Sequence, residues 1–143
     1  MLNANNISDR ESLLEVLTEV QRIFSVRREY RISTEAMTGI YEALEWCSRN
    51  FDLNEGTESY IRGNFNAVGG HDWASSISSI ANKKTSEAQK QPNARGGEAE
   101  YGLRSLMQIL KDGKLKTSES AMVSALKGYL NDVVEESNWA PKV

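Results

Sequence analysis

The stretch from Ser33 to Phe51 constrains the fold more than any other part of the chain, because its apolar residues recur at the spacing of an amphipathic helix. On a helical wheel these residues form one stripe, which a helix buries against the rest of the protein. The stripe comprises Met37, Ile40, Tyr41, Leu44, Cys47 and Phe51. A hydroxyl of Ser33 or Thr34 can cap the first free amides, and Glu35 in the first turn complements the helix dipole. The sequence therefore predicts a core helix with a well-marked start.

Trp46 does not belong to this stripe. At about 100° per residue it falls among Glu35, Glu42 and Arg49, on the side facing away from Leu44. That side of the helix is either covered by another helix of the domain or exposed as a binding surface. A helical wheel does not distinguish the two, so both alternatives stay open at this point.

Amphipathic patterns predict further helices around the core helix. Ser8 and Glu11 stand at the S-x-x-E spacing of a capping box, which opens a helix reaching about Arg28. The short link from there to the core helix predicts that the two helices are antiparallel neighbours. Weaker patterns predict a short helix from near Thr57 and a further one from Asp72.

The C-terminal part of the chain shows two stronger patterns. An apolar stripe from Ala99 to Leu110 ends at Asp112-Gly113, where a glycine is the expected helix exit. Ser118 and Glu119 then start a last helix, whose apolar residues continue to Val134. We expect these two helices to form a tight helical hairpin.

These patterns predict an all-α fold, an irregular bundle of five or six helices with a flexible polar loop in the middle. A chain of 143 residues fits one domain, here residues 1 to 143. Within it, residues 1 to 7 are predicted to be loose, residues 82 to 97 to form a mobile polar loop, and residues 137 to 143 to form a tail. Strand signals are nearly absent, because alternating β-branched segments bounded by turns are missing.

Composition and the first residues favour a cytoplasmic protein without membrane contact. No run approaches the roughly 18 apolar residues that a membrane span needs. The N-terminal residues lack the basic and apolar regions of a signal peptide. A single cysteine cannot form an internal disulfide, which agrees with a reducing compartment.

The sequence offers little support for catalysis or metal binding. His71 is the only histidine, and a nucleophilic pair with Cys47 would need an exposed thiol, whereas Cys47 lies on the buried stripe. A structural zinc site needs about four ligands, mainly Cys and His, and the chain has one of each. Phosphate-binding glycine motifs are also missing. We therefore expect a non-enzymatic protein without a cofactor or metal.

Aromatic residues away from the core stripes favour a protein-interaction module, acting as an adaptor, assembly subunit or inhibitor. Trp46 and Tyr101 lie opposite the stripes of their helices, and Trp139 lies in the tail. Tryptophan and tyrosine are enriched where proteins meet proteins, so these three are the predicted protein-binding residues. The expected partner is another protein or a second copy of this chain. Small helical proteins of this kind occur among phage, viral and bacterial accessory proteins, which is a fold-level analogy.

The alternative is a helical subunit that binds nucleic acid. Residues 57 to 97 hold five bases and three acids, a net charge of +2 in a chain whose total is −3. A contact along a phosphate backbone would use bases at the end of the first helix and in the middle of the chain. These bases are Arg22, Arg27, Arg28, Arg31, Lys83, Lys84 and Arg95. Pairing of the arginines with nearby glutamates explains them equally well, and the charge is unlike that of a dedicated duplex-DNA binder.

Overall fold

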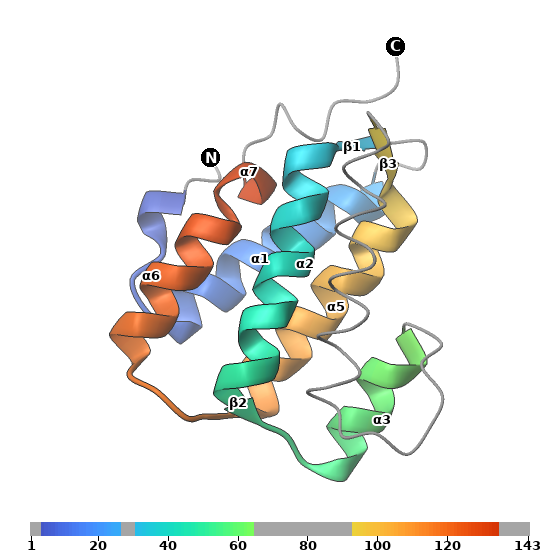
Figure 1. Cartoon of the computed structure of the whole chain (residues 1–143). Helices are drawn as coiled ribbons and strands as arrows, with labels where there is room; N and C mark the ends of the chain where they lie inside the picture. Colours follow the sequence, from blue (N-terminus) through green and yellow to red (C-terminus); the bar gives the residue numbers. More distant parts are fainter. Residues whose placement is uncertain (1–3, 27–30, 65–92, 135–143) are drawn as a thin grey trace.

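The helix predicted from Ser33 to Phe51 lies at the centre of the protein in a computed structural model, which describes residues 4–26, 31–64 and 93–134 (Figure 1). The chain opens with a short 3-10 turn, Ala4–Asn6. The α-helices are α1 (Arg10–Val26), α2 (Thr34–Asn50), α3 (Glu55–Asn64), α5 (Gly96–Asp112), α6 (Glu119–Tyr129) and α7 (Asn131–Val134). The strands are β1 (Arg31–Ser33), β2 (Phe51–Asp52), β3 (Asn93–Arg95) and β4 (Lys114–Leu115).

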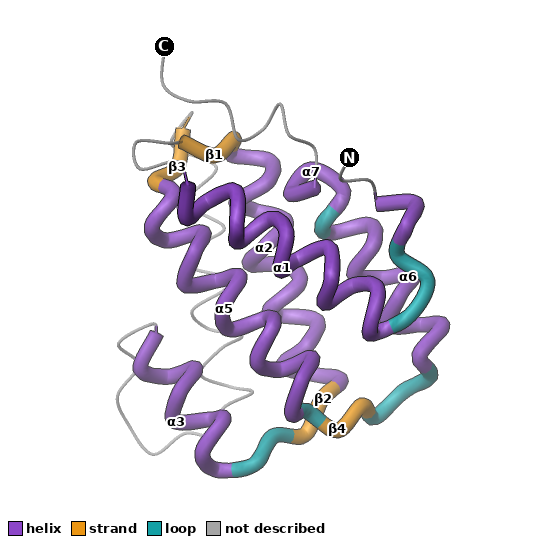
Figure 2. Tube along the Cα trace, turned by 180° about the vertical axis from the view of Figure 1, so that it is seen from behind, coloured by secondary structure: helices purple, strands orange, loops and turns teal. Residues whose placement is uncertain are grey.

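The described residues confirm the prediction of an all-α bundle. α5 flanks α2 on one side and α6 with α7 on the other, while α1 crosses behind them and α3 packs against α5 (Figures 1 and 2). The whole apolar stripe predicted for α2 is buried, and Ser33 Oγ accepts a hydrogen bond from the Ala36 amide at 3.1 Å as the N-cap. Among the helices in this part of the chain, none combines the length and apolarity needed to cross a lipid bilayer.

Two short antiparallel ladders join α2 to α5 at both ends. β1 pairs with β3 where the two helices begin, and β2 pairs with β4 where they end. α2 and α5 have 17 residues each and run in the same direction (Figure 1). Because the two helices have equal length, the strands that follow them can pair as well as the strands that precede them. The near absence of strands expected from the sequence is confirmed, because the described residues contain strands only at these four places. Strands of two or three residues are too short to show the alternation by which a strand is identified.

These ladders also decide which helices pack together, and two expectations based on short connections were wrong. α1 packs mainly against α5 instead of being the antiparallel neighbour of α2, because β3 pairs with β1 and brings the start of α5 to that position. α6 packs against α2 instead of forming a hairpin with α5. The reason is that β4 pairs with β2 across the end of α2, so the chain reaches the other side of α2 before α6 begins (Figure 1).

The N-terminal cap of α1 lies one residue later than the predicted capping box of Ser8 and Glu11. Asp9 Oδ1 accepts a hydrogen bond from the Ser12 amide at 2.8 Å, and Ser12 Oγ accepts one from the Asp9 amide at 3.0 Å. The Ser8 amide also donates to Ser12 Oγ, at 2.8 Å. A serine thus takes the reciprocal role usually filled by glutamate or glutamine, which is why the spacing rule pointed to the wrong pair.

Two other boundaries differ from prediction. α3 begins at Glu55, two residues before Thr57, because Asn54 Oδ1 accepts from the Thr57 amide at 2.8 Å. Residues 93 to 97 of the predicted middle loop form β3 and the start of α5. The remainder of that loop, the helix predicted from Asp72 and the tail from residue 137 lie outside the described residues.

The last predicted helix is interrupted at Leu130, which separates α6 from α7 and has φ −95° and ψ 4°. The break lies where this part of the chain meets α2 most closely. A Cβ atom added at Gly39 of α2 would stand 2.1 Å from the carbonyl oxygen of Tyr129, so only glycine allows this approach. Gly39 therefore sets how deeply the α6–α7 segment packs against α2.

Candidate functional site

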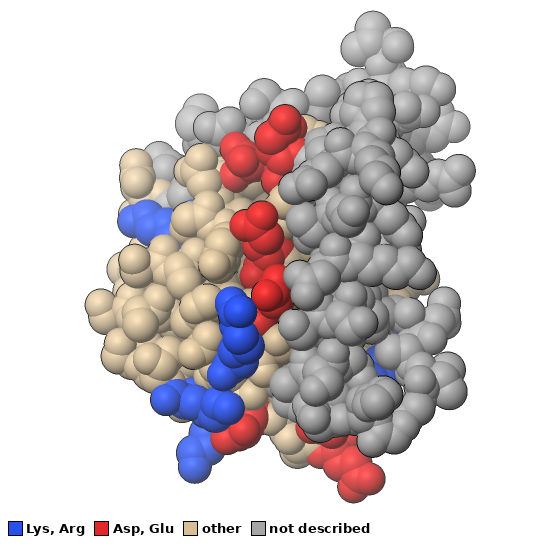
Figure 3. Space-filling view, in the orientation of Figure 1, with Lys and Arg blue, Asp and Glu red and all other residues tan. Residues whose placement is uncertain are grey.

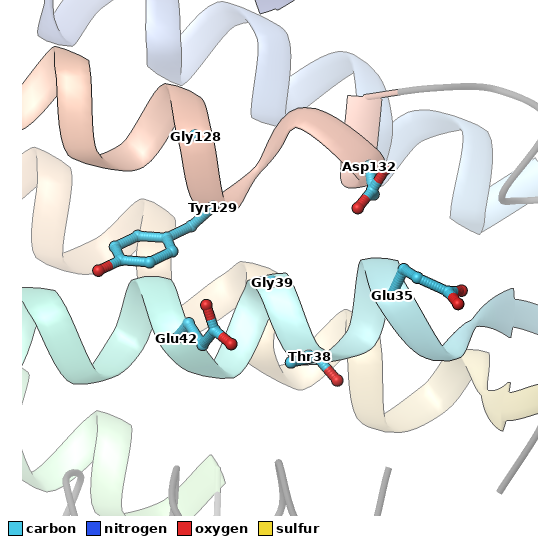
Figure 4. A pocket seen from close by; sticks show the side chains of 7 residues that line it. All are labelled: Glu35, Thr38, Gly39, Glu42, Gly128, Tyr129 and Asp132. Atoms are coloured by element: carbon cyan, nitrogen blue, oxygen red, sulfur yellow. The ribbon is translucent and has the colours of Figure 1, made fainter. Parts of the chain in front are cut away.

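A groove of about 480 Å³ opens between α2 and the α6–α7 segment. We call it the α2–α6 groove (Figure 4). It is lined by Glu35, Thr38, Gly39, Glu42, Gly128, Tyr129 and Asp132. Its lining comes from two segments that are about 90 residues apart in the sequence, one within α2 and one spanning the break between α6 and α7, and both segments pack against the core. The groove is therefore a preformed feature of the fold, as is usual for binding sites.

Glycines and one aromatic ring shape this groove. Gly39 is buried against the Tyr129 carbonyl and forms the floor, while Gly128 is exposed at the rim with no atom within 4 Å of the position of a Cβ. Figure 4 shows the Tyr129 ring projecting from α6 over the adjacent turns of α2. Tyr129 is half-buried and packs against the core, so its ring has little freedom to move. The groove thus offers a fixed aromatic wall beside an unobstructed helix backbone.

The charge of the groove is one-sided. Glu35 and Glu42 project from α2 and Asp132 projects from α7, and none of the lining residues that the structure describes is a lysine or arginine. Glu35 and Glu42 are seven residues apart on one helix, which places them two turns or about 10 Å from each other. Figure 3 shows acidic side chains following one another down the middle of this face, with basic side chains gathered at its lower end. The charged side chains among the described lining residues are therefore all acidic.

The predicted protein-binding residues lie elsewhere in the fold. Trp46 on α2 is half-buried and packs against the core, with its ring edge-on to Phe51 at 6.4 Å between centroids and 74° between planes. Tyr101 on α5 is 48% exposed, and the Arg104 guanidinium lies 5.7 Å from its ring centroid. Trp139 lies outside the described residues. Neither Trp46 nor Tyr101 is among the residues that line the groove.

The predicted nucleic-acid-binding residues are only partly described. Arg22 is exposed on α1 and forms an ion pair with Glu19, which raises the pKa of the guanidinium and lowers that of the carboxyl. Arg31 and Arg95 are 64 positions apart in sequence, yet they are register partners in the β1–β3 ladder. Arg27, Arg28, Lys83 and Lys84 lie outside the described residues.

The described residues contain no cluster of metal-binding side chains, and their one thiol is buried. Cys47 is fully buried, and burial raises the pKa of its thiol far above the usual value, so it is poorly suited to be a nucleophile. Its suggested partner His71 lies outside the described residues. Within the ranges that the structure describes, no three His, Cys, Asp or Glu side chains come together in a way that could hold a metal ion.

Comparison of the chain with known protein families, curated proteins and solved structures gives no match.

Sequence reasoning missed the groove because no single helix contains it. On a helical wheel, Glu35 and Glu42 fall on the same side of α2 as Trp46, and Asp132 falls away from the apolar residues of the last predicted helix. The remaining indication in the sequence is the pair of glycines at positions 39 and 128. A glycine inside a helix lowers helix stability and often marks a place where another segment packs closely against the backbone. Only the packing of α6 on α2 brings these residues together.

Proposed function

We propose that this chain is a non-enzymatic protein-interaction module, an adaptor, assembly subunit or inhibitor, that holds a segment of a partner polypeptide in the α2–α6 groove. The observation that carries the proposal is the groove itself: an open, preformed concavity with a fixed tyrosine wall and a glycine floor. Tyrosine contributes more contact energy per residue than most side chains at protein interfaces, and the exposed Gly128 leaves the helix backbone at the rim accessible to a partner.

Exposed aromatic side chains on a different face support the same class of function. Tyr101 on α5 and Tyr60 on α3 are 48% and 43% exposed, and α3 packs against α5. Tyr101 remains a proposed contact residue, as does Trp139. Trp46 makes a smaller contribution in this proposal, because part of its ring surface is already used against Phe51. A module with two such faces would join two partners, which is what an adaptor or assembly subunit does.

Two glycine substitutions provide a matched test of the groove. Gly128→Trp places a large ring at the rim of the groove, and Gly63→Trp places the same ring on α3, and neither Cβ position has an atom within 4 Å. Tagged proteins are purified with nuclease from the cells that produce this chain, and the bound proteins are identified by mass spectrometry. We expect a stoichiometric partner with wild type and Gly63→Trp that is lost with Gly128→Trp. The same partners on all three proteins would contradict the groove as the binding site.

The alternative, binding of nucleic acid, is favoured by one specific observation. The β1–β3 ladder makes Arg31 and Arg95 register partners, so two positions of the predicted basic set that are 64 residues apart in the sequence come together. This alternative predicts that nucleic acid copurifies with the chain, that affinity falls steeply with salt, and that Arg31→Gln combined with Arg95→Gln weakens binding. Binding that is absent, or that does not depend on salt, would exclude it.

A further inference from the structure

The contact between α3 and α5 is small and partly polar. Of the ten residues of α3, only Thr57 and Ile61 are buried. Thr57 Oγ1 donates a hydrogen bond to Asp112 Oδ2 at 3.4 Å, and Asn64 Nδ2 donates one to Ser105 Oγ at 3.0 Å. Ile61 is thus the one apolar residue of α3 that the fold buries completely, whereas α2 buries a whole apolar stripe.

The two hydrogen bonds show how much of α5 is covered by α3. Thr57 and Asn64 are seven residues apart on α3. Their partners Asp112 and Ser105 are seven residues apart on α5 in the reverse order, so the two helices are antiparallel and α3 lies along the last two turns of α5 (Figure 2). Tyr101 lies one turn before Ser105 on the same face of α5 and is 48% exposed. The covered face of α5 therefore continues directly into an exposed aromatic side chain.

We propose that α3 is a removable cover of α5, which detaches as a unit while the rest of the bundle stays folded and so uncovers the face that continues from Tyr101. Because a local equilibrium governs this opening, exposure of the face does not require unfolding of the whole protein. The inference is independent of the α2–α6 groove, since none of the lining residues that the structure describes belongs to α3 or α5.

The other long helices have more partners in the bundle than α3 has. α5 packs against α1, α2 and α3, and α2 packs against α5, α6 and α7. Within the described residues, α3 packs chiefly against α5. A helix of ten residues is marginal in water without tertiary contacts. The order of α3 therefore depends heavily on the packing of Ile61 and on the two hydrogen bonds to α5.

The segments next to the contact remain anchored when α3 detaches. Leu53, two residues before α3, packs against the core. On α5, Gln108 Nε2 donates a hydrogen bond to Asp112 Oδ2, so this carboxylate keeps a partner after Thr57 has left. α5 itself stays packed against α1 and α2. The opening is therefore confined to α3 and the face beneath it.

A cysteine in place of Ser105 tests the proposal, with Cys47 as an internal control. Both side chains are fully buried, Ser105 at the contact with α3 and Cys47 in the core. The Ser105→Cys protein is treated with excess Ellman's reagent, and modification of each thiol is followed by mass spectrometry of proteolytic peptides. We expect the thiol at position 105 to react at least about 100-fold faster than Cys47, because local opening requires less free energy than global unfolding. Equal rates would overturn the proposal.

Two further substitutions in the Ser105→Cys protein separate local opening from global unfolding. Val20→Ala weakens the buried side of α1, which stays packed when only α3 detaches, so it should accelerate modification of Cys47 and leave the rate at position 105 unchanged. Ile61→Ala removes the main apolar contact of α3 and should raise the rate at position 105 at least tenfold, by roughly the loss typical of such a truncation. Equal acceleration of both thiols by Val20→Ala would show that α3 opens only with the whole protein.

Hydrogen exchange of the unaltered protein provides a second measurement, since Ser105→Cys removes the hydroxyl that accepts from Asn64. The backbone amides of Ile61 and Arg62 report on α3, and that of Leu44 reports on α2. We expect the α3 amides to be at least about 100-fold less protected than the α2 amide, with a weaker dependence on urea because less surface becomes exposed. The same protection and the same urea dependence for both helices would contradict the removable cover.

Discussion

The guanidinium of Arg10 lies over the ring of Phe51, with its central carbon 5.3 Å from the ring centroid. Its Nη1 atom also donates hydrogen bonds to the carbonyl oxygens of Gly113 at 3.1 Å and Leu110 at 3.4 Å, just where α5 ends. The first residue of α1 thus contacts the residue that follows α2 and the C-terminus of α5. Because α2 and α5 run in the same direction, their C-terminal ends, which carry partial negative charge, lie close together here. The positive charge of Arg10 reduces the repulsion between them.

Replacing Arg10 by methionine should therefore destabilise the whole bundle, because methionine keeps much of the apolar stem and removes the charge and the hydrogen bonds. We expect a loss of about 1–3 kcal/mol in the free energy of unfolding, measured by urea denaturation. Arg49→Met is the control, because Arg49 forms only an exposed pair with Glu45 at 3.3 Å, worth about 0.5 kcal/mol. Equal losses for the two variants would show that the Arg10 contacts are not special.

Gly39→Ala should destabilise the protein although alanine is the better helix former. The added Cβ would stand 2.1 Å from the Tyr129 carbonyl oxygen, so α6 must move away from α2. We expect a net cost of about 1–3 kcal/mol, typical of overpacking, visible as a lower urea midpoint. Gly63→Ala on α3 meets no atom within 4 Å and should instead stabilise the protein by up to about 1 kcal/mol. A neutral or stabilising Gly39→Ala would mean that the two segments are not in close contact.

The cap of α1 should make stability depend on acid pH. The hydrogen bond from the Ser12 backbone, followed by that from its side chain, lowers the pKa of Asp9 from its usual value near 3.8. Because the folded pKa is the lower one, this stabilisation is complete above the unfolded pKa and is lost as the pH falls through the folded pKa. The difference in urea midpoint between wild type and Asp9→Asn should thus be larger at neutral pH than at pH 2. A difference that stays constant would argue against a charged cap.

Cys47 should be unreactive as long as the protein is folded. Burial in the apolar core raises the pKa of its thiol, so almost no thiolate forms at neutral pH, and a reagent cannot reach the sulfur. We expect a disulfide reagent such as Ellman's to modify Cys47 at the rate of unfolding, and at once in denaturant. Rapid modification of the native protein would show that α2 is not buried as described.

The sequence was sufficient for the elements whose cause is local. The apolar stripe of α2, its serine cap, the glycine after Asp112 and the cap of α6 at Ser118 are all visible within one or two turns, and the structure confirms each of them. Such features depend on the spacing of neighbouring residues, which a helical wheel represents directly. The cap of α1, predicted one residue too early, also depends on neighbouring residues. Two capping patterns overlap within residues 8 to 12, and the spacing rule selected the wrong one.

The candidate site was not predictable in the same way. Glu35, Glu42, Tyr129 and Asp132 could each be assigned to a side of a helix, but nothing in the spacing of one helix says which other helix covers it. The break at Leu130 was not predictable from the sequence either, because the apolar pattern of the last predicted helix continues through it. The contact with Gly39 that accompanies the break comes from a segment about 90 residues away.

By itself, then, the sequence determined that this chain forms amphipathic helices around a core helix at residues 33 to 51. The reason is that each amphipathic helix must bury its own apolar stripe, and that stripe is visible in the spacing of its residues. Only the tertiary structure decided that α6 crosses to the far side of α2 and that α1 packs against α5. Both arrangements depend on two ladders of two and three residues, whose paired residues are 60 to 64 positions apart. Backbone pairing of this kind leaves no periodic pattern in the sequence, and the groove between α2 and α6 exists because of it.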